Sequence, residues 1–267
     1  DFENKAAELY DKSGNWPTLG RELLMLKHVA DMLETAPAEP AMKDLWLPDL
    51  QIMTARRGDM FVAVKGGHNG ESHNHNDVGS LLVYAGGTPL LIDPGTGSYT
   101  AQTFGSKRYD IWTMQSQYHN LPIINGTGQK DGSEYAAKAV RYDDGTLQMD
   151  IAGCYPESAA VAGWKRTVKC TGKGVTVSED YVLDKADGET AVILMTTSVP
   201  DLTDNGIVRL ADGHYISYSP GQFEVRSEDI SHMLDEVLQQ CWGPSMHRII
   251  MTVKSNSCKG KLHYSIR

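Results

Sequence analysis

Residues 66–77 hold three of the chain's nine histidines, together with two acidic residues and three asparagines. Side chains two positions apart on an extended backbone face the same way, so this spacing predicts His73 and His75 side by side. Each neutral imidazole carries one hydrogen-bond donor and one acceptor, and both need partners when the ring is buried. Two neighbouring imidazoles therefore indicate metal binding or proton transfer in this segment.

Two further candidate ligands follow downstream. Asp93 ends the apolar run 90–92, where an isolated aspartate would more often bond its own turn backbone. His119, taken alone, would more often be an ordinary core or surface histidine. Together with one or both of His73 and His75, they form a nitrogen and oxygen set that zinc accepts with one position open. A buried polar network without metal is the alternative interpretation.

Three polar residues of the same segment take supporting roles. Asn74, between the two histidines, is assigned to substrate binding. Asn76 and Asp77 are assigned to loop support, since a carboxylate there is suited to accepting hydrogen bonds from the backbone or from asparagine. Glu71 is the one nearby candidate for a general base.

Basic and aromatic residues lie between Asp93 and His119 in the sequence. Lys107 and Arg108 are placed to reach an anionic ligand, although such pairs are more often solvated surface. The rings of Tyr99, Trp112 and Tyr118 offer an apolar platform for a sugar or, equally well, core packing. Arg108 and Tyr118 are the predicted substrate-binding residues.

Composition limits the classes of function. The net charge is −9, from 25 basic and 34 acidic residues, which argues against general nucleic-acid binding because that requires a basic surface. An acidic substrate would need a local positive site, such as a metal with nearby basic residues. No apolar run is long enough to cross a bilayer. No Cys-x-x-Cys spacing occurs among the four cysteines, which disfavours a thiolate zinc site.

The pattern of apolar residues changes from a helical period to a period of two along the chain. Residues 1 to about 36 indicate helix, and Pro37 and Pro40 mark a linker. From about residue 50, roughly a dozen apolar or alternating runs separated by turn residues indicate strands, and 230–240 a short helix. The prediction is a mainly β protein with a large antiparallel β-sandwich over 41–267 and a short helical segment over 1–40.

Four segments carry a family resemblance. Residues 68–80, 89–95, 116–122 and 124–126, with Gln129 and Gly132, resemble the heparinase II/III family of polysaccharide lyases, most densely over about 54–140. That family joins an N-terminal α/α toroid to a C-terminal antiparallel β-sandwich. The resemblance implies that His73 borders the substrate cleft as a catalytic residue, and that His75, Asp93 and His119 bind zinc. The resemblance therefore identifies His75, and not His73, as the zinc ligand, a choice that the spacing of the two residues leaves open.

The resemblance also implies an activity and a compartment. Members cleave uronic-acid-containing glycans by β-elimination, with an acidic polysaccharide as substrate. The tyrosine that acts as base or acid and the residue that neutralises the carboxylate lie largely in the toroid. Residues 1–40 would then be the last helices of a toroid, and the chain alone would be inactive. The resemblance also implies that the protein is located in the periplasm or outside a bacterial cell. The alternatives are a zinc-dependent hydrolase and a non-catalytic glycan-binding β-sandwich.

Overall fold

A computed structural model describes residues 19–36, 43–255 and 257–267, and the chain divides into two units at residues 42 and 43. In the first unit, helix α2 (Leu19–Glu34) has no buried side chain. It confirms the predicted helix over those residues, whereas the predictions for 1–18 and for the linker at 37–40 lie outside the described residues. The assignment of this unit to a toroid stays a prediction.

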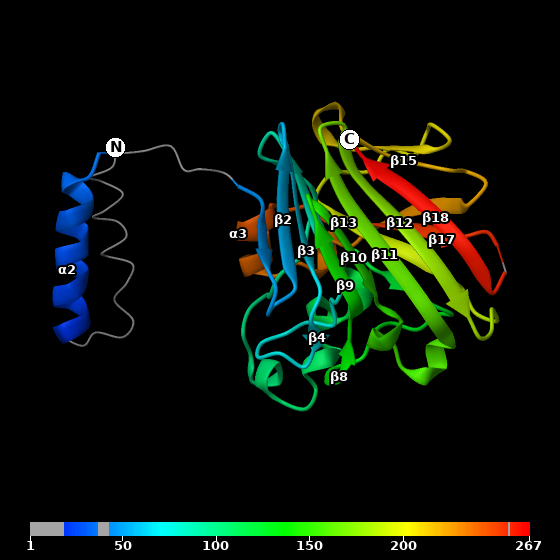
Figure 1. Cartoon of the computed structure of the whole chain (residues 1–267), viewed down its shortest axis with the longest axis horizontal. Coiled ribbons are helices and arrows are strands. Elements are labelled where there is room, and N and C mark those ends of the chain that lie inside the picture. Colours follow the sequence, from blue (N-terminus) through cyan, green and yellow to red (C-terminus); the bar gives the residue numbers. More distant parts are fainter. Residues whose placement is uncertain (1–18, 37–42, 256) are drawn as a thin grey trace. The chain divides into compact units, whose positions relative to one another are not determined.

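The second unit is built from antiparallel sheets (Figure 1). The first has the order β1 (Leu45–Leu47), β2 (Ile52–Arg57), β3 (Met60–Lys65), β5 (Leu81–Ala85), β6 (Thr88–Leu91). The second has the order β16 (Phe223–Asp229), β17 (His247–Val253), β13 (Ala191–Thr196), β7 (Pro122–Ile123). The third has the order β14 (Ile207–Arg209), β15 (Tyr215–Tyr218), β18 (Lys259–Ile266), β12 (Gly174–Leu183), β11 (Val161–Thr171), β10 (Thr146–Asp150), β9 (Lys138–Asp143). A short fourth sheet pairs β4 (His68–Asn69) with β8 (Gly132–Ala136).

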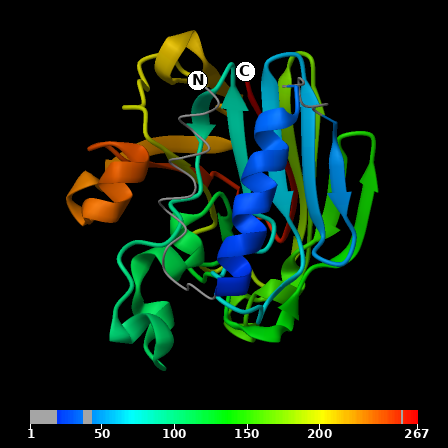
Figure 2. The same cartoon turned by 90° about the vertical axis from the view of Figure 1, so that its left-hand side faces the viewer.

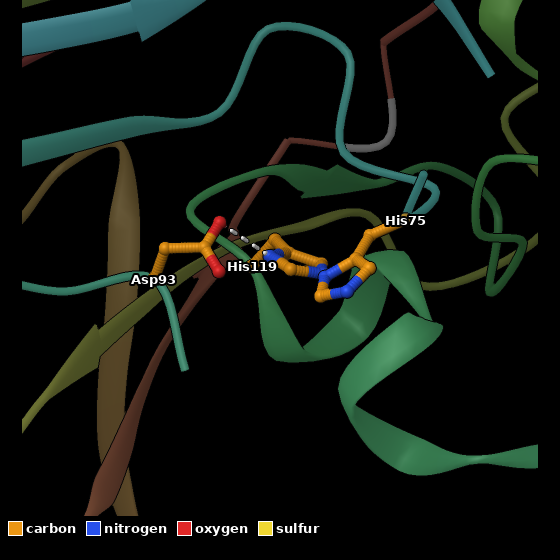
Figure 3. Close-up of side chains that lie close together, drawn as sticks. All are labelled: His75, Asp93 and His119. Atoms are coloured by element: carbon orange, nitrogen blue, oxygen red, sulfur yellow. Dashed lines mark hydrogen bonds and ion pairs between the residues drawn. The ribbon is translucent and has the colours of Figure 1, made fainter. Parts of the chain in front are cut away.

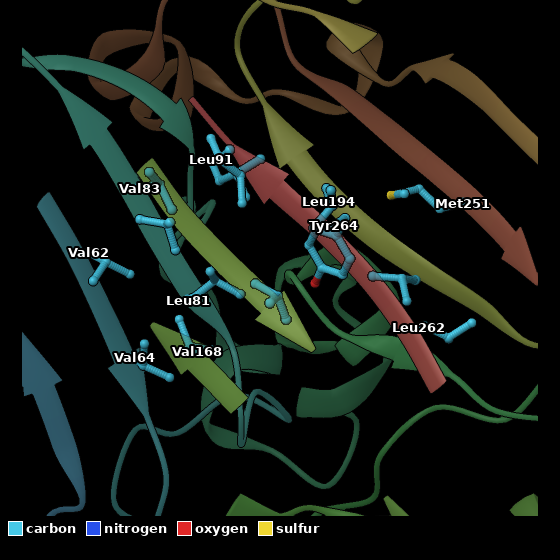
Figure 4. Close-up of a cluster of buried hydrophobic side chains, with 14 of the residues drawn as sticks. Val62, Val64, Leu81, Val83, Leu91, Val168, Leu194, Met251, Leu262 and Tyr264 are labelled. Atoms are coloured by element: carbon cyan, nitrogen blue, oxygen red, sulfur yellow. The ribbon is translucent and has the colours of Figure 1, made fainter. Parts of the chain in front are cut away.

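The first two sheets meet at one edge, where the Ile92 amide donates to the Met195 carbonyl at 3.0 Å. The side chains of one buried cluster come from both of these sheets and from the seven-stranded sheet, and Figure 4 shows its members Val62, Leu194 and Tyr264. Burial alternates along β3, as expected for a strand with one face in a core. The predicted mainly β antiparallel sandwich is confirmed.

Turn chemistry explains one hairpin and one wrong prediction. Asp144 and Gly145 connect β9 to β10 with φ of 33° and 69°, the paired positive values of a type I′ turn. In contrast, residues 70–80 form bends and turns, not the predicted extended backbone. His73 has φ of 60°, and asparagine side chains bond the backbone there, so the alternation assumed for His73 and His75 fails.

A long irregular segment between β6 and β7 carries four 3₁₀ turns, η1 (Ala101–Phe104), η2 (Arg108–Asp110), η3 (Trp112–Met114) and η4 (Ser116–Tyr118). Figure 2 shows it in green below the short helix α3 (Glu236–Trp242), in orange. The segment and α3 contribute to a second apolar cluster that includes Ile193 and Leu238. The helix predicted over 230–240 begins at Glu236 instead of residue 230, directly after its N-cap Asp235. The four cysteines are free thiols.

None of the helices in the described part of the chain combines the length and the apolar character that a membrane-spanning helix requires.

Candidate metal centre

Three loops bring His75, Asp93 and His119 together, as Figure 3 shows. His75 comes from the turns between β4 and β5, Asp93 follows β6, and His119 follows η4. One potential ligand atom from each residue lies within 4.8 Å of the other two. The structure thus assembles the predicted metal ligands from positions as far apart as 44 residues in the chain, by the difference between 119 and 75.

Hydrogen bonds orient His119 and Asp93, two of the three candidate ligands. His119 is fully buried, and its Nε2 donates to the Thr113 carbonyl at 3.0 Å, which leaves Nδ1 facing Asp93 Oδ2 at 3.1 Å. The other carboxylate oxygen, Oδ1, accepts the Gly95 amide at 2.9 Å. Asp93 therefore makes the turn contact expected of an isolated aspartate and also presents its second oxygen to the site.

The electrostatic environment favours a neutral His75 and an ionised Asp93. Burial, and then the nearby charge of His119, lowers the pKa of His75 from 6.5 to about 4. Burial opposes charge on His119 and Asp93 as well, but their mutual attraction prevails. It raises the pKa of His119 and holds the pKa of Asp93 below its usual range.

The donor set fits a divalent cation. A neutral His119 protonated at Nε2 directs the lone pair of Nδ1 at an anionic oxygen of Asp93, an arrangement that needs a proton or a cation between them. A tetrahedral zinc ion with bonds of about 2.1 Å places its ligand atoms roughly 3.4 Å apart. The Nδ1 to Oδ2 distance of 3.1 Å is close to this value, and His75 adds a third donor, the second neutral imidazole. The Thr113 carbonyl supplies the outer contact typical of ligating histidines.

Buried hydrogen bonds of Asn120 fix the backbone next to two of the candidate ligands. Asn120 Nδ2 donates to the carbonyls of Leu81 and Ile92, at 2.6 and 2.8 Å, and its Oδ1 accepts the Met195 amide at 2.7 Å. The Asn120 carbonyl accepts from Arg166 at 2.7 Å. These bonds hold the residues directly next to Asp93 and His119. Asn120 has no predicted role in the sequence, although its position directly after His119 was the available signal.

Arg166 is itself fully buried and paired. Its guanidinium donates to both oxygens of Glu179, the shortest contact being 2.5 Å, and to the Gly79 carbonyl at 2.7 Å. Trp164 Nε1 also donates to Glu179, at 2.8 Å. A buried pair with its remaining donors satisfied can keep its charges without water. It joins the seven-stranded sheet to the loops of the metal centre.

The two predicted loop-support residues take different partners. Asn76 donates from its backbone amide to Met114 and from its side chain to the Gln129 carbonyl, at 3.0 and 3.5 Å. The Asp77 carboxylate accepts from Lys65 Nζ at 2.5 Å, a cation in place of the backbone or asparagine donors expected. Glu71 lies 3.8 Å from the same Lys65 Nζ and is not part of the three-residue ligand group.

Gln129, for which the sequence suggested no role, supports this loop. Its side chain accepts from Asn69 and from the Val78 amide and donates to the Val78 carbonyl, at 3.0, 3.1 and 2.7 Å. A buried amide that pairs with a backbone N–H and C=O mimics a strand neighbour. Gln129 thereby fixes the turns that carry His75.

His73 lies apart from the ligand group. Its ring is exposed and meets the edge of Phe104 at 6.1 Å, with 84° between the planes. Phe104 stacks on Tyr99 at 5.6 Å. His73 therefore faces the surface on the loop whose interior side carries His75.

Two of the predicted substrate-binding residues bond each other. Arg108 donates from Nε and Nη2 to the Asn74 carbonyl, at 3.3 and 2.9 Å, and from Nη1 to the Thr103 carbonyl at 2.8 Å. The buried Asn74 side chain accepts from the Tyr109 hydroxyl at 2.7 Å. Both residues are thus engaged in holding two loops together.

The third, Tyr118, packs in the second apolar cluster with Trp112. The two rings lie 5.1 Å apart, and the Arg248 guanidinium stands 4.6 Å over Tyr118. Trp112 and Tyr118 thus pack in the core, which was the alternative to a platform for a sugar. Of the three rings proposed as a platform, Tyr99 is the exposed one, with 58% of its surface accessible.

Solved structures of lyases share this fold. Heparan sulfate lyase HepC from Pedobacter heparinus is 14% identical over 100% of this chain and 42% of its own, with a TM-score of 0.63. A heparinase III structure is 15% identical over 87% of this chain and 37% of its own, with a TM-score of 0.57. The chain therefore spans less than half the length of these proteins. No curated protein sequence matches the chain.

One family model matches the sequence. It describes the C-terminal region of heparinase II/III-like proteins and covers residues 40–169, which include His73 and the three ligand residues. The resemblance expected from the motifs is thereby confirmed. Residues 40–169 match a heparinase II/III-like C-terminal domain in sequence, and the solved lyase structures share the fold of the chain.

Proposed function

We propose that this chain is the metal-binding C-terminal part of a polysaccharide lyase that cleaves uronic-acid-containing glycans by β-elimination. The observation that carries the proposal is the convergence of His75, Asp93 and His119 in a heparinase II/III-like domain, with His73 exposed on the same loop. The substrate of the similar HepC structure is heparan sulfate, by its name. An acidic polysaccharide of this class is the substrate we propose.

The chemistry requires groups on both sides of the reacting sugar. Removal of the uronate C5 proton becomes feasible when the carboxylate charge is neutralised and the developing enolate is stabilised. A base then takes the proton, and an acid protonates the departing glycosidic oxygen. We assign His73 to contact with the reacting sugar, because its side chain is exposed and the family resemblance implies that it borders the substrate cleft. A bound zinc ion would supply positive charge and fix the loop that carries His73.

The remaining catalytic groups belong, in this proposal, to an α/α toroid domain elsewhere in the same protein. This chain covers 42% of HepC, which leaves room for such a domain. Residues 1–267 alone should therefore lack the tyrosine base and the group that neutralises the substrate carboxylate. We propose that the chain by itself is inactive.

Product analysis tests both statements. The purified chain and a longer form of the protein that includes the toroid are incubated with heparan sulfate, chondroitin sulfate and alginate, and 4,5-unsaturated uronate is measured by its absorbance. Product is expected only from the longer form, with a large loss in its His73→Ala variant. Unsaturated product from the chain alone would refute its inactivity, and incorporation of solvent oxygen without unsaturation would indicate a hydrolase.

We also propose that the protein works in the periplasm or outside a bacterial cell. The support is the family resemblance, since acidic polysaccharides are met outside the cytoplasm. Cell fractionation with an antibody against the chain tests the compartment, and a purely cytoplasmic signal would contradict it.

A further inference from the structure

Two stacked aromatic rings stand exposed beside His73. Tyr99 and Phe104 are 58% and 69% exposed, and their ring centroids lie 5.6 Å apart with 14° between the planes. Phe104 also lies roughly perpendicular to the His73 ring, with 6.1 Å between the ring centroids. Large apolar surfaces held in water are unfavourable and commonly mark a binding surface.

Hydrogen bonds hold the backbone on both sides of the rings. Arg108 ties the carbonyl of Thr103, directly before Phe104, to the carbonyl of Asn74, directly after His73. On the other side of Tyr99, the Ser98 amide donates to Asp235 at 2.5 Å. Phe104 and His73 are therefore fixed relative to each other before any ligand arrives, which lowers the entropic cost of binding.

The charges of the segment that carries the rings suit an anionic partner, and the nearby Asp235 carboxylate accepts the backbone amides of Ser98 and Leu238. Residues 99–110 contain two basic side chains, Lys107 and Arg108, and one acidic side chain, Asp110. Lys107 is exposed. The Arg108 bonds go to backbone carbonyls, which carry no formal charge, so its positive charge is not neutralised by them.

We propose that Tyr99 and Phe104 form a stacking subsite for one pyranose ring of an acidic glycan, next to the sugar that contacts His73. The proposal rests on the proposed function and adds a specific subsite to it. A pyranose ring has an apolar face of C–H groups that packs on an aromatic face while its hydroxyl and acidic groups stay in water. Lys107 would lie toward the acidic groups.

The test uses the purified chain loaded with zinc and a heparan sulfate hexasaccharide, with affinity measured by isothermal titration calorimetry. Tyr99→Ala and Phe104→Ala should each weaken binding about three- to ten-fold, the range expected for loss of one aromatic contact. Tyr99→Phe and Phe104→Tyr keep the rings and should bind within two-fold of the unaltered chain. Phe104→Leu keeps apolar area without the ring and should behave like the alanine variant.

Val199→Ala is a matched control, because Val199 is an exposed apolar residue at 73% accessibility and belongs to a different loop. It should leave the affinity unchanged. Lys107→Gln should reduce the dependence of affinity on salt, whereas the ring variants should not, since stacking is uncharged. All replaced side chains are exposed, so unchanged thermal unfolding confirms that each variant is folded.

Three results would overturn the subsite. They are no binding by the unaltered chain, equal binding by the Tyr99→Ala/Phe104→Ala double variant, and a ring variant that destabilises the longer protein without changing affinity. The last result would mean that a protein segment covers the rings. Unsaturated product from the longer protein in any of these cases would leave the lyase proposal standing. Ring-dependent binding without that product would refute the lyase proposal alone.

Discussion

His75 and His73, two residues apart, face opposite sides of one loop. The His75 ring is buried beside His119, with 5.3 Å between ring centroids, whereas His73 is exposed against Phe104. The φ of 60° at His73 produces this separation. Because the two imidazoles do not share partners, metal binding and substrate contact can be tested one at a time.

Replacing His75 should abolish tight metal binding. His75→Ala and Asp93→Asn each remove one of three protein ligands, and we expect at least a 100-fold loss of zinc affinity. His73→Ala is the matched control and should bind zinc as tightly as the unaltered chain. Elemental analysis and competition with a chromophoric chelator measure both. Equal losses for His73→Ala and His75→Ala would contradict the assignment of ligands.

Removing the metal should lower thermal stability. An ion present at 100 times its dissociation constant adds about 2.7 kcal/mol to the free energy of unfolding. For a domain of this size that corresponds to a rise of roughly 5–10 °C in the midpoint. Calorimetry with and without EDTA measures the difference. Asp93→Asn should show no response to EDTA, and an EDTA effect of the same size in that variant would argue against this site.

In the metal-free chain, stability should fall as the pH falls from about 6.5 to 4. The pKa of His75 is lowered from 6.5 to about 4, so in this window the unfolded chain binds a proton that the folded chain does not. The free energy of unfolding should decrease by roughly 3 kcal/mol, since each pKa unit corresponds to 1.36 kcal/mol.

His119 and Asp93 should not change the free energy of unfolding between about pH 6.5 and 4. The pKa of His119 is raised, so its contribution is complete below 6.5 and is lost only as the pH rises through the raised value. The pKa of Asp93 is lowered, so its contribution is lost only in stronger acid, below 3.8. Urea unfolding of the chain and of His75→Gln from pH 4 to 7 measures the difference, and parallel curves would refute it.

Asn120 should control the metal site through the backbone. Asn120→Ala leaves the Ile92 carbonyl and the Met195 amide without their partner, which should cost on the order of 3 kcal/mol of stability. Because Ile92 and His119 adjoin it, zinc affinity should also fall about 10- to 100-fold, the range found for outer-sphere residues.

Asn125 provides the matched control. Its side chain likewise donates to two carbonyls, those of Ala159 and Lys185, at 2.8 and 2.9 Å. Asn125→Ala should lower stability without changing zinc affinity in the folded chain. A similar loss of affinity in both variants would mean that Asn120 acts through general stability.

The buried Arg166 and Glu179 should be strongly coupled. Arg166→Met leaves a buried carboxylate with only Trp164 as a donor, and we expect a loss of about 3–5 kcal/mol. The double variant Arg166→Met/Glu179→Leu should lose less than the sum of the single changes. A double-mutant cycle by urea unfolding measures the coupling, and additive losses would contradict it.

The sandwich and the candidate ligand group could be predicted because both depend on local sequence patterns. Alternating apolar runs predict strands, and His75, Asp93 and His119 lie in family motifs. Prediction failed where a side chain serves a distant backbone group. Asn120 and Gln129 bond residues that are up to 75 positions away, and the left-handed φ of His73 follows from the packing of its loop. Such contacts become visible only after the chain has folded.

The Arg108 bridge has a thermodynamic consequence. It joins the backbone of Phe104 to the peptide between His73 and His75, so a sugar on the outer rings and an ion in the interior restrain the same loop. Two ligands that order one element favour each other, and by reciprocity each changes the affinity of the other by an equal factor. Glycan affinity measured with and without zinc should therefore differ by the same ratio as zinc affinity measured with and without glycan.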